Sequence, residues 1–189
     1  MPSQQRSQQR SETYTTADIY TLPDNVRAEL INGRLYPMET PNRIHQQILQ
    51  QLGSIIMDHI EANDLHHHVY ISRLAVFPFA DDQNYVEPDV TVICDESKLN
   101  DLGCNGAPDW IIEITSDHSK AMDYYRKPSL YLESGVRLYW IVDPERKCVW
   151  VYDLEHEAAP EVYDMTSEIP VEIYPGFSVD FSELCRIYY

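Results

Sequence analysis

The sequence is poor in the features that mark secreted and membrane proteins. It has only four cysteines, Cys94, Cys104, Cys148 and Cys185, and none of them forms a C-x-x-C pair. No apolar stretch approaches the roughly 18 to 20 residues that a membrane-spanning helix needs. No charged segment leads into an apolar core of the kind found in signal peptides. We therefore expect a cytoplasmic protein with reduced thiols, no disulfide framework and no membrane association.

Basic residues are also scarce. The chain has 14 Lys and Arg against 31 Asp and Glu, which gives a formal net charge of -17 at pH 7. Such a charge repels a polyanion at long range and excludes loose electrostatic binding of DNA. Any nucleic-acid function must overcome this repulsion, which a metal ion and a local basic groove can do. The cations available for such a groove are Arg126, Lys127 and Arg137.

The composition is that of a folded globular protein. Hydrophobic residues make up 43% of the chain and aromatic residues 11%, including 14 Tyr. A chain of 189 residues is long enough to bury a core without disulfide or metal staples. Residues 1–12 are rich in Gln, Ser and Arg and are predicted to form a disordered tail. We expect residues 13–189 to form a single domain without internal repeats.

Two acidic residues occur at the ends of apolar strands. Asp89 precedes the run Val90–Cys94, and Glu113 lies inside the run Trp110–Ile114. A carboxylate among Ile and Val loses its hydration unless a metal ion, a cation or hydrogen-bond donors replace the water. Runs that are almost continuously apolar also indicate strands covered on both faces of a sheet. The pair therefore indicates a divalent metal site between neighbouring buried strands.

The rest of the pattern alternates helices with strands. A long helix begins after Asn42, with an apolar stripe at steps of three and four residues and with His45 on its polar face. Pro128 either kinks the later helical segment or begins its second half, and Gly135 ends it. The other predicted elements are a short helix over 17–22, a hairpin around Asn32-Gly33, a strand within 68–79, a polar loop over 95–106, a helical segment over 119–134, a hairpin of 137–143 with 147–153, and polar strand fragments beyond it. This order predicts an α/β sandwich with a mixed central β-sheet flanked by helices.

Six short segments, taken in order, resemble a known family. They are Glu29–Gly33, His45–Gln46, Glu87–Val90, Ala107–Ile114, Asp123 with Lys127 four residues later, and Gly135–Pro144. Together they are similar to the Uma-two type endonucleases, a branch of the PD-(D/E)XK nuclease superfamily with the restriction endonuclease-like fold. The resemblance runs from about Tyr14 to Phe181, and the ordered set is specific although each segment alone is weak.

The resemblance implies a role for each matching residue. Asp89 and Glu113 would bind Mg²⁺ or Mn²⁺, with the Ile114 carbonyl as a further ligand. The superfamily has a lysine two residues after its second carboxylate, where this chain has Thr115. The resemblance implies that Lys127 replaces that lysine as a catalytic residue. It also implies that Glu29 completes the metal shell and that His45 faces the substrate backbone.

Each of these residues also has a structural explanation. Asp89 can be a turn residue after proline, Glu29 can pair with an arginine of its hairpin, and most helix lysines are solvated. His45 can belong to a solvated helix face. The run His66–His68 is predicted to lie on the surface, because consecutive strand residues alternate sides and cannot converge on one metal ion.

Three functions follow from the resemblance and the charge. The first is a metal-dependent endonuclease that hydrolyses phosphodiester bonds of DNA. The second is a catalytically degenerate nuclease fold that serves as a binding or regulatory module, which Thr115 and the net charge favour. The third is a hydrolase of a non-nucleic phosphate ester, which suits an acidic surface. We also expect a homodimer that pairs through the aromatic hairpin bearing Trp140, Trp150 and Tyr152.

Overall fold

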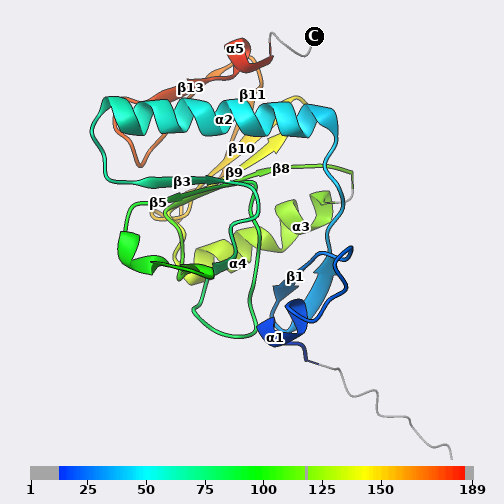
Figure 1. The fold of residues 1–189 in the computed structure, drawn as a ribbon. Coiled ribbons are helices and arrows are strands. Elements are labelled where there is room, and N and C mark those ends of the chain that lie inside the picture. The colour runs from blue at the N-terminus through cyan, green and yellow to red at the C-terminus, as the bar shows by residue number, and fades with distance from the viewer. Residues whose placement is uncertain (1–12, 118, 186–189) are drawn as a thin grey trace, which may run out of the picture.

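A six-stranded mixed β-sheet forms the centre of the computed structural model, which describes residues 13–117 and 119–185 (Figure 1). The strand order is β11-β10-β9-β8-β5-β3. The bounds are β3 His68–Ile71, β5 Val90–Ile93, β8 Trp110–Ile114, β9 Leu138–Asp143, β10 Cys148–Asp153 and β11 Glu161–Asp164. The predicted disordered tail, residues 1–12, lies outside the described residues. The single domain over residues 13–189 stays a prediction.

The sheet is mixed because one of its connections is a helical crossover. β8 and β9 run parallel, whereas the other neighbouring strands pair antiparallel. Parallel neighbours need a long connection, and α3 (Lys120–Tyr125) and α4 (Lys127–Ser134) supply it. Pro128 lies in the first turn of α4, so it begins a second helix rather than kinking one long helix. Gly135 ends α4 in the left-handed conformation, with φ of 92°.

Helices cover both faces of this sheet, which confirms the predicted α/β sandwich (Figure 1). The helix α2 (Arg43–Ala62) begins at Asn42, whose side chain accepts a hydrogen bond from the His45 N–H. Its predicted apolar stripe packs on one face through Ile48, Leu52, Ile56 and Ile60. On the opposite face, α4 contributes Leu130 and Tyr131 to a second cluster. None of the helices within the described ranges has the length and apolar character to cross a membrane.

A hairpin near the N-terminus stands beside the helices of the second face (Figure 1). Its strands are β1 (Ala28–Ile31) and β2 (Arg34–Pro37). Asn32 and Gly33 join them with φ values of 49° and 71°, as the predicted Asn-Gly turn requires. The preceding helix α1 (Thr16–Ile19) is shorter than the predicted range 17–22. The prediction placed this helix one residue too late, because Thr15 is the capping residue.

The predicted strand within 68–79 and the loop over 95–106 were wrong in detail. Ser72 and Arg73 have φ values of 60° and 61°, so the chain turns after β3 and leaves the central sheet. It then forms β4 (Val76–Phe77), which belongs to a separate three-stranded sheet. The other strands of that sheet, β6 (Leu99–Asn100) and β7 (Gly103–Asn105), follow the 3₁₀ helix η1 (Glu96–Lys98). Such short strands have too few residues to show a period of two.

The C-terminal region also differs from its prediction. β9 and β10 form the expected antiparallel hairpin, but β11 pairs with β10 and covers its outer edge. Trp140 is fully buried and packs edge-on against Trp110 with ring centroids 4.9 Å apart. The aromatic hairpin is therefore not an open edge for self-pairing, and this basis for a homodimer was wrong. The remaining elements, β12 (Glu168–Pro170), β13 (Ser178–Asp180) and α5 (Phe181–Cys185), add buried residues to the α2 side of the core.

Candidate active site

The register of two central strands brings Asp89 and Glu113 together. Val90 of β5 is the direct partner of Ile112 in β8, and the strands run antiparallel. The residue before Val90 therefore lies beside the residue after Ile112. The Ile114 N–H donates a hydrogen bond of 2.8 Å to Oδ2 of Asp89, which ties the two strand ends together. The two carboxylates are therefore neighbours across β5 and β8, as the sequence predicted.

Lys127 joins them from the first residue of α4. Its Nζ lies 2.8 Å from Oε1 of Glu113, 2.9 Å from Oε1 of Glu29 and 3.5 Å from Oδ1 of Asp123. Only 4% of the residue is exposed, so this lysine is not one of the solvated helix lysines. Glu113 reaches it because strand side chains alternate and every second residue of β8 points toward α3 and α4. We call Glu29, Glu113, Asp123 and Lys127 the buried ion cluster.

Tyr131 completes the environment of Glu113. Its hydroxyl donates a 3.1 Å hydrogen bond to the same Oε1 atom that contacts Lys127. Glu29 is oriented in a similar way, because the Glu87 N–H donates to its Oε1 at 3.3 Å. Both carboxylates are therefore held through one oxygen atom, which leaves the second oxygen of Glu113 without a hydrogen-bond partner among the described residues.

Burial and charge set the protonation of the cluster. Burial lowers the pKa of Lys127, but the carboxylates of Glu113, Glu29 and Asp123 outweigh it and raise that pKa well above its usual value. Lys127 is consequently an ammonium group at neutral pH. Burial, together with the neighbouring carboxylates, raises the pKa of Glu113 well above its usual value, and burial raises the pKa of Asp123 to about 6. Negative charge exceeds positive charge in the cluster, which favours the uptake of a further cation.

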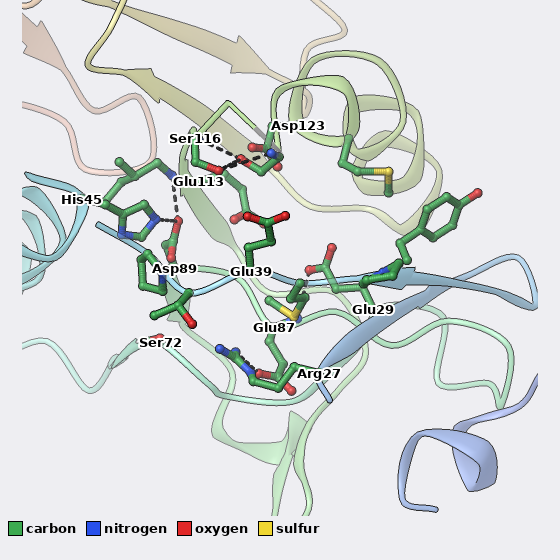
Figure 2. Close-up of a pocket in the computed structure, with 18 of the residues that line it drawn as sticks. Arg27, Glu29, Glu39, His45, Ser72, Glu87, Asp89, Glu113, Ser116 and Asp123 are labelled. Atoms are coloured by element: carbon green, nitrogen blue, oxygen red, sulfur yellow. Dashed lines mark hydrogen bonds and ion pairs between the residues drawn. The ribbon is translucent and has the colours of Figure 1, made fainter. Parts of the chain in front are cut away.

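His45 occupies a different place from the one expected. We predicted it on the polar face of α2, but only 7% of the residue is exposed. Its Nε2 lies 3.0 Å from Oδ2 of Asp89, so the ring turns inward to the strand end. The dashed line in Figure 2 marks this contact. His45 therefore touches a candidate metal ligand.

One cavity of about 110 Å³ is lined by the four residues of the buried ion cluster and by Asp89 and His45. Figure 2 shows the carboxylates of Asp89, Glu113 and Glu39 pointing into this space, with the Arg27–Glu87 ion pair on its lower side. The lining contains two cations, Arg27 and Lys127. It contains six carboxylates, those of Glu29, Glu39, Glu87, Asp89, Glu113 and Asp123. The cavity is therefore strongly acidic when no cation is bound.

The donor set at the cavity fits a hard divalent ion. Asp89 and Glu113 each have one carboxylate oxygen without a hydrogen-bond partner among the described residues, and Ile114 lines the same cavity. Mg²⁺ is commonly held by one or two carboxylates while water and substrate phosphate fill its other positions. Within residues 13–117 and 119–185, no three His, Cys, Asp or Glu side chains are grouped as an all-protein metal site would require. The arrangement therefore suits an ion whose coordination shell is completed by water and by substrate.

Sequence reasoning named five of the residues that meet here and gave two others no role. The structure brings Asp89, Glu113, Lys127, Glu29 and His45 to one cavity. Asp123 and Tyr131 were given no role, although they lie four residues before and after Lys127, with Asp123 in α3 and Tyr131 on the same face of α4 as Lys127. That spacing could have identified both.

Arg137, expected near the site, pairs instead with Asp109 and Glu155. Asp109 precedes β8 and therefore lies at the opposite end of that strand from Glu113.

The fold belongs to the restriction endonuclease-like class of nucleases. A crystal structure from Anabaena variabilis, described as "a putative nuclease belonging to DUF820", matches 90% of this chain and 96% of its own, with a TM-score of 0.72 and 23% identity. Residues 12–182 match the Uma2 family, described as "Putative restriction endonuclease", and the chain belongs to this family. Restriction endonuclease-like proteins generally use divalent metal ions. The comparison with curated proteins found no match.

Proposed function

We propose that the protein is a metal-dependent endonuclease that hydrolyses phosphodiester bonds of DNA. The observation that carries this proposal is the convergence of Asp89, Glu113 and Lys127 at one end of two neighbouring strands, inside one cavity. Phosphodiester hydrolysis develops negative charge on the attacking water and on the leaving oxygen, and buried cations with carboxylate ligands are suited to stabilise it.

Each residue has a separate task in this proposal. Asp89 and Glu113, with the Ile114 carbonyl, would hold Mg²⁺ or Mn²⁺. A bound divalent ion supplies a water molecule of lowered pKa and neutralises phosphate charge. Lys127 is protonated and cannot act as a general base, so in this proposal its positive charge stabilises the negative charge that develops on the attacking water and on the phosphate. Glu29 holds the Lys127 ammonium in position. A direct metal contact of Glu29 stays a prediction.

His45 would keep Asp89 oriented toward the ion through the 3.0 Å contact with Oδ2. The residue therefore acts on substrate through Asp89 in this proposal. The direct contact between His45 and the substrate backbone, which the family resemblance implied, stays a prediction.

The acidity and small volume of the cavity favour one alternative. A cavity of about 110 Å³ with six carboxylates against two cations suits a small phosphate ester that arrives with its own metal ion. A chain with a net charge of -17 also repels such an ester less than it repels a long polyanion. The alternative substrate is therefore a non-nucleic phosphate monoester or diester.

Cleavage assays at low salt separate these functions. Purified parent protein is incubated with single-stranded, double-stranded and supercoiled DNA, and with a chromogenic phosphate ester, in Mg²⁺ or Mn²⁺. Cleavage of DNA that EDTA abolishes supports the endonuclease. Hydrolysis of the ester without cleavage of DNA supports the alternative. If neither substrate reacts, the degenerate binding module replaces both.

A matched pair of variants tests the site. Glu113→Gln should lose cleavage by about 10²-fold or more and should weaken Mn²⁺ binding in calorimetry, because it removes a charged ligand. Glu133→Gln changes an exposed glutamate on α4 and should behave like the parent. Equal metal binding by Glu113→Gln and Glu133→Gln would contradict the site.

Two further parts of the proposal concern assembly and location. We expect a homodimer, because two active sites are needed to cut both strands of a duplex in one encounter. Sedimentation of the purified protein tests this, and a monomer at tens of micromolar would count against it. Action in the reduced cytoplasm stays a prediction from the cysteine pattern.

A further inference from the structure

The junction of α3 and α4 carries two adjacent cations that point in different directions. Arg126 ends α3 and Lys127 begins α4. Lys127 turns inward to the buried ion cluster, whereas Arg126 is exposed. The Arg126 guanidinium carbon lies 5.1 Å from the ring centroid of Tyr36, a distance typical of cation–π contacts. Tyr36 lines the same cavity as Glu113.

Arg126 differs from several other cations of this acidic chain in what lies beside it. Arg27, Lys120, Arg137 and Arg146 each lie within 4.0 Å of at least one carboxylate. Arg126 has no carboxylate at that distance among the residues that the structure describes. An aromatic ring holds the guanidinium without neutralising it, so both its charge and its hydrogen-bond donors remain available.

Tyr36 and Glu29 place this arginine close to the chemistry. The two residues are direct partners in the β1–β2 hairpin, so their side chains project from the same face about 5 Å apart. Glu29 contacts Lys127 and Tyr36 contacts Arg126, so the hairpin and the helix junction meet through two matched pairs. The hairpin lies beside these helices in Figure 1. Arg126 therefore lies beside two residues that line the cavity, Tyr36 and Lys127.

We propose that Arg126, positioned by Tyr36, binds the phosphate that neighbours the scissile phosphate of a nucleic-acid strand. This inference rests on the proposed function and adds the contact that an acidic cavity requires to hold a polyanion. A guanidinium donates two parallel hydrogen bonds to phosphate oxygens, and its planar face can stay on the tyrosine ring while it does so. The contact reads the backbone and not the base, so it acts on every sequence equally.

The test is the salt dependence of strand binding in a cleavage-deficient background. Glu113→Gln protein is titrated into a fluorescently labelled single-stranded oligodeoxynucleotide, and the dissociation constant is measured by anisotropy at several salt concentrations in Mg²⁺. Adding Arg126→Ala should weaken binding about tenfold at low salt, the loss of one charged contact. The slope of log affinity against log salt should also fall by about 0.7, the value for one phosphate on a single strand.

Two control variants make the result specific. Arg146 also lies over a tyrosine, 5.3 Å from the Tyr124 ring, but it is paired with Asp143, and Tyr124 is not among the residues that line the cavity, whereas Tyr36 is. Arg146→Ala removes the same charge and should leave the slope unchanged. Arg126→Lys keeps the charge without the planar fork, so it should restore the slope and only part of the affinity.

The outcomes are distinguishable from failure of the proposed function. Equal slopes for Arg126→Ala and Arg146→Ala, in a protein whose parent cleaves DNA, would overturn this inference alone. No binding of the strand at any salt concentration, together with no cleavage by the parent, would overturn both proposals. Because Arg126 is exposed, its substitution should not disturb folding.

Discussion

Replacing the ammonium of Lys127 should destabilise the protein far more than a surface lysine would. In Lys127→Met the side chain keeps its length and apolar stem but loses the charge between Glu29, Glu113 and Asp123. All three carboxylates are buried, so they can recover only a small part of their hydration. Removing one partner of a buried ion pair typically costs about 3 to 5 kcal/mol. That is a large part of the about 5 to 15 kcal/mol by which domains are stable.

The expected change is large enough for a simple thermal melt. For a chain of this length, each kcal/mol lowers Tm by about 2 to 4 °C, so the variant should melt about 6 to 20 °C below the parent in EDTA. Circular dichroism measures this directly. Lys120→Met is the matched control, because Lys120 also lies near three carboxylates, Asp117, Asp143 and Glu145, but is more exposed. Its loss should cost about 1 kcal/mol or less.

A double substitution tests the physical cause. Glu113→Gln on the Lys127→Met background neutralises one of the unpaired buried carboxylates, so it should recover part of the lost Tm. If Lys127→Met melts within about 2 °C of the parent, or if the second substitution lowers Tm further, unpaired buried charge is not the cause.

Two further predictions concern buried hydroxyl and thiol groups. Tyr131→Phe removes a hydrogen bond to Glu113 and should weaken Mn²⁺ binding in calorimetry. Tyr139→Phe, which removes a hydrogen bond to a backbone carbonyl, should leave Mn²⁺ binding unchanged. Equal effects of the two substitutions would contradict the positioning role of Tyr131. Burial raises the pKa of Cys94 and of Cys104 to about 11, so the thiolate fraction is small at pH 8. Iodoacetamide should label both thiols slowly at pH 8, and the labelling rate should rise about tenfold per pH unit from 8 to 10. Rapid labelling of the native protein at pH 8 would show that the two thiols are not buried in this way.

The strands and turns of this protein could be predicted because their causes are local. The apolar runs 90–94 and 110–114 gave two central strands, and Asn32-Gly33 gave the hairpin turn, since each depends on neighbouring residues only. The stripe of α2 likewise follows from residue spacing. The short strands β4, β6 and β7 were missed because segments of two or three residues show no period.

The functional site was likewise predictable from the sequence only in part. The sequence alone predicts that Asp89 and Glu113 need a compensating partner, because each is a carboxylate among Ile and Val residues. Which groups meet them depended on the strand register and on the angle at which α4 crosses the sheet. Sequence could not decide whether burial or carboxylates dominate the pKa of Lys127, because the answer depends on distances of 2.8 and 2.9 Å between residues far apart in the chain. For the same reason only the tertiary structure turned His45 inward and placed Arg126 over Tyr36.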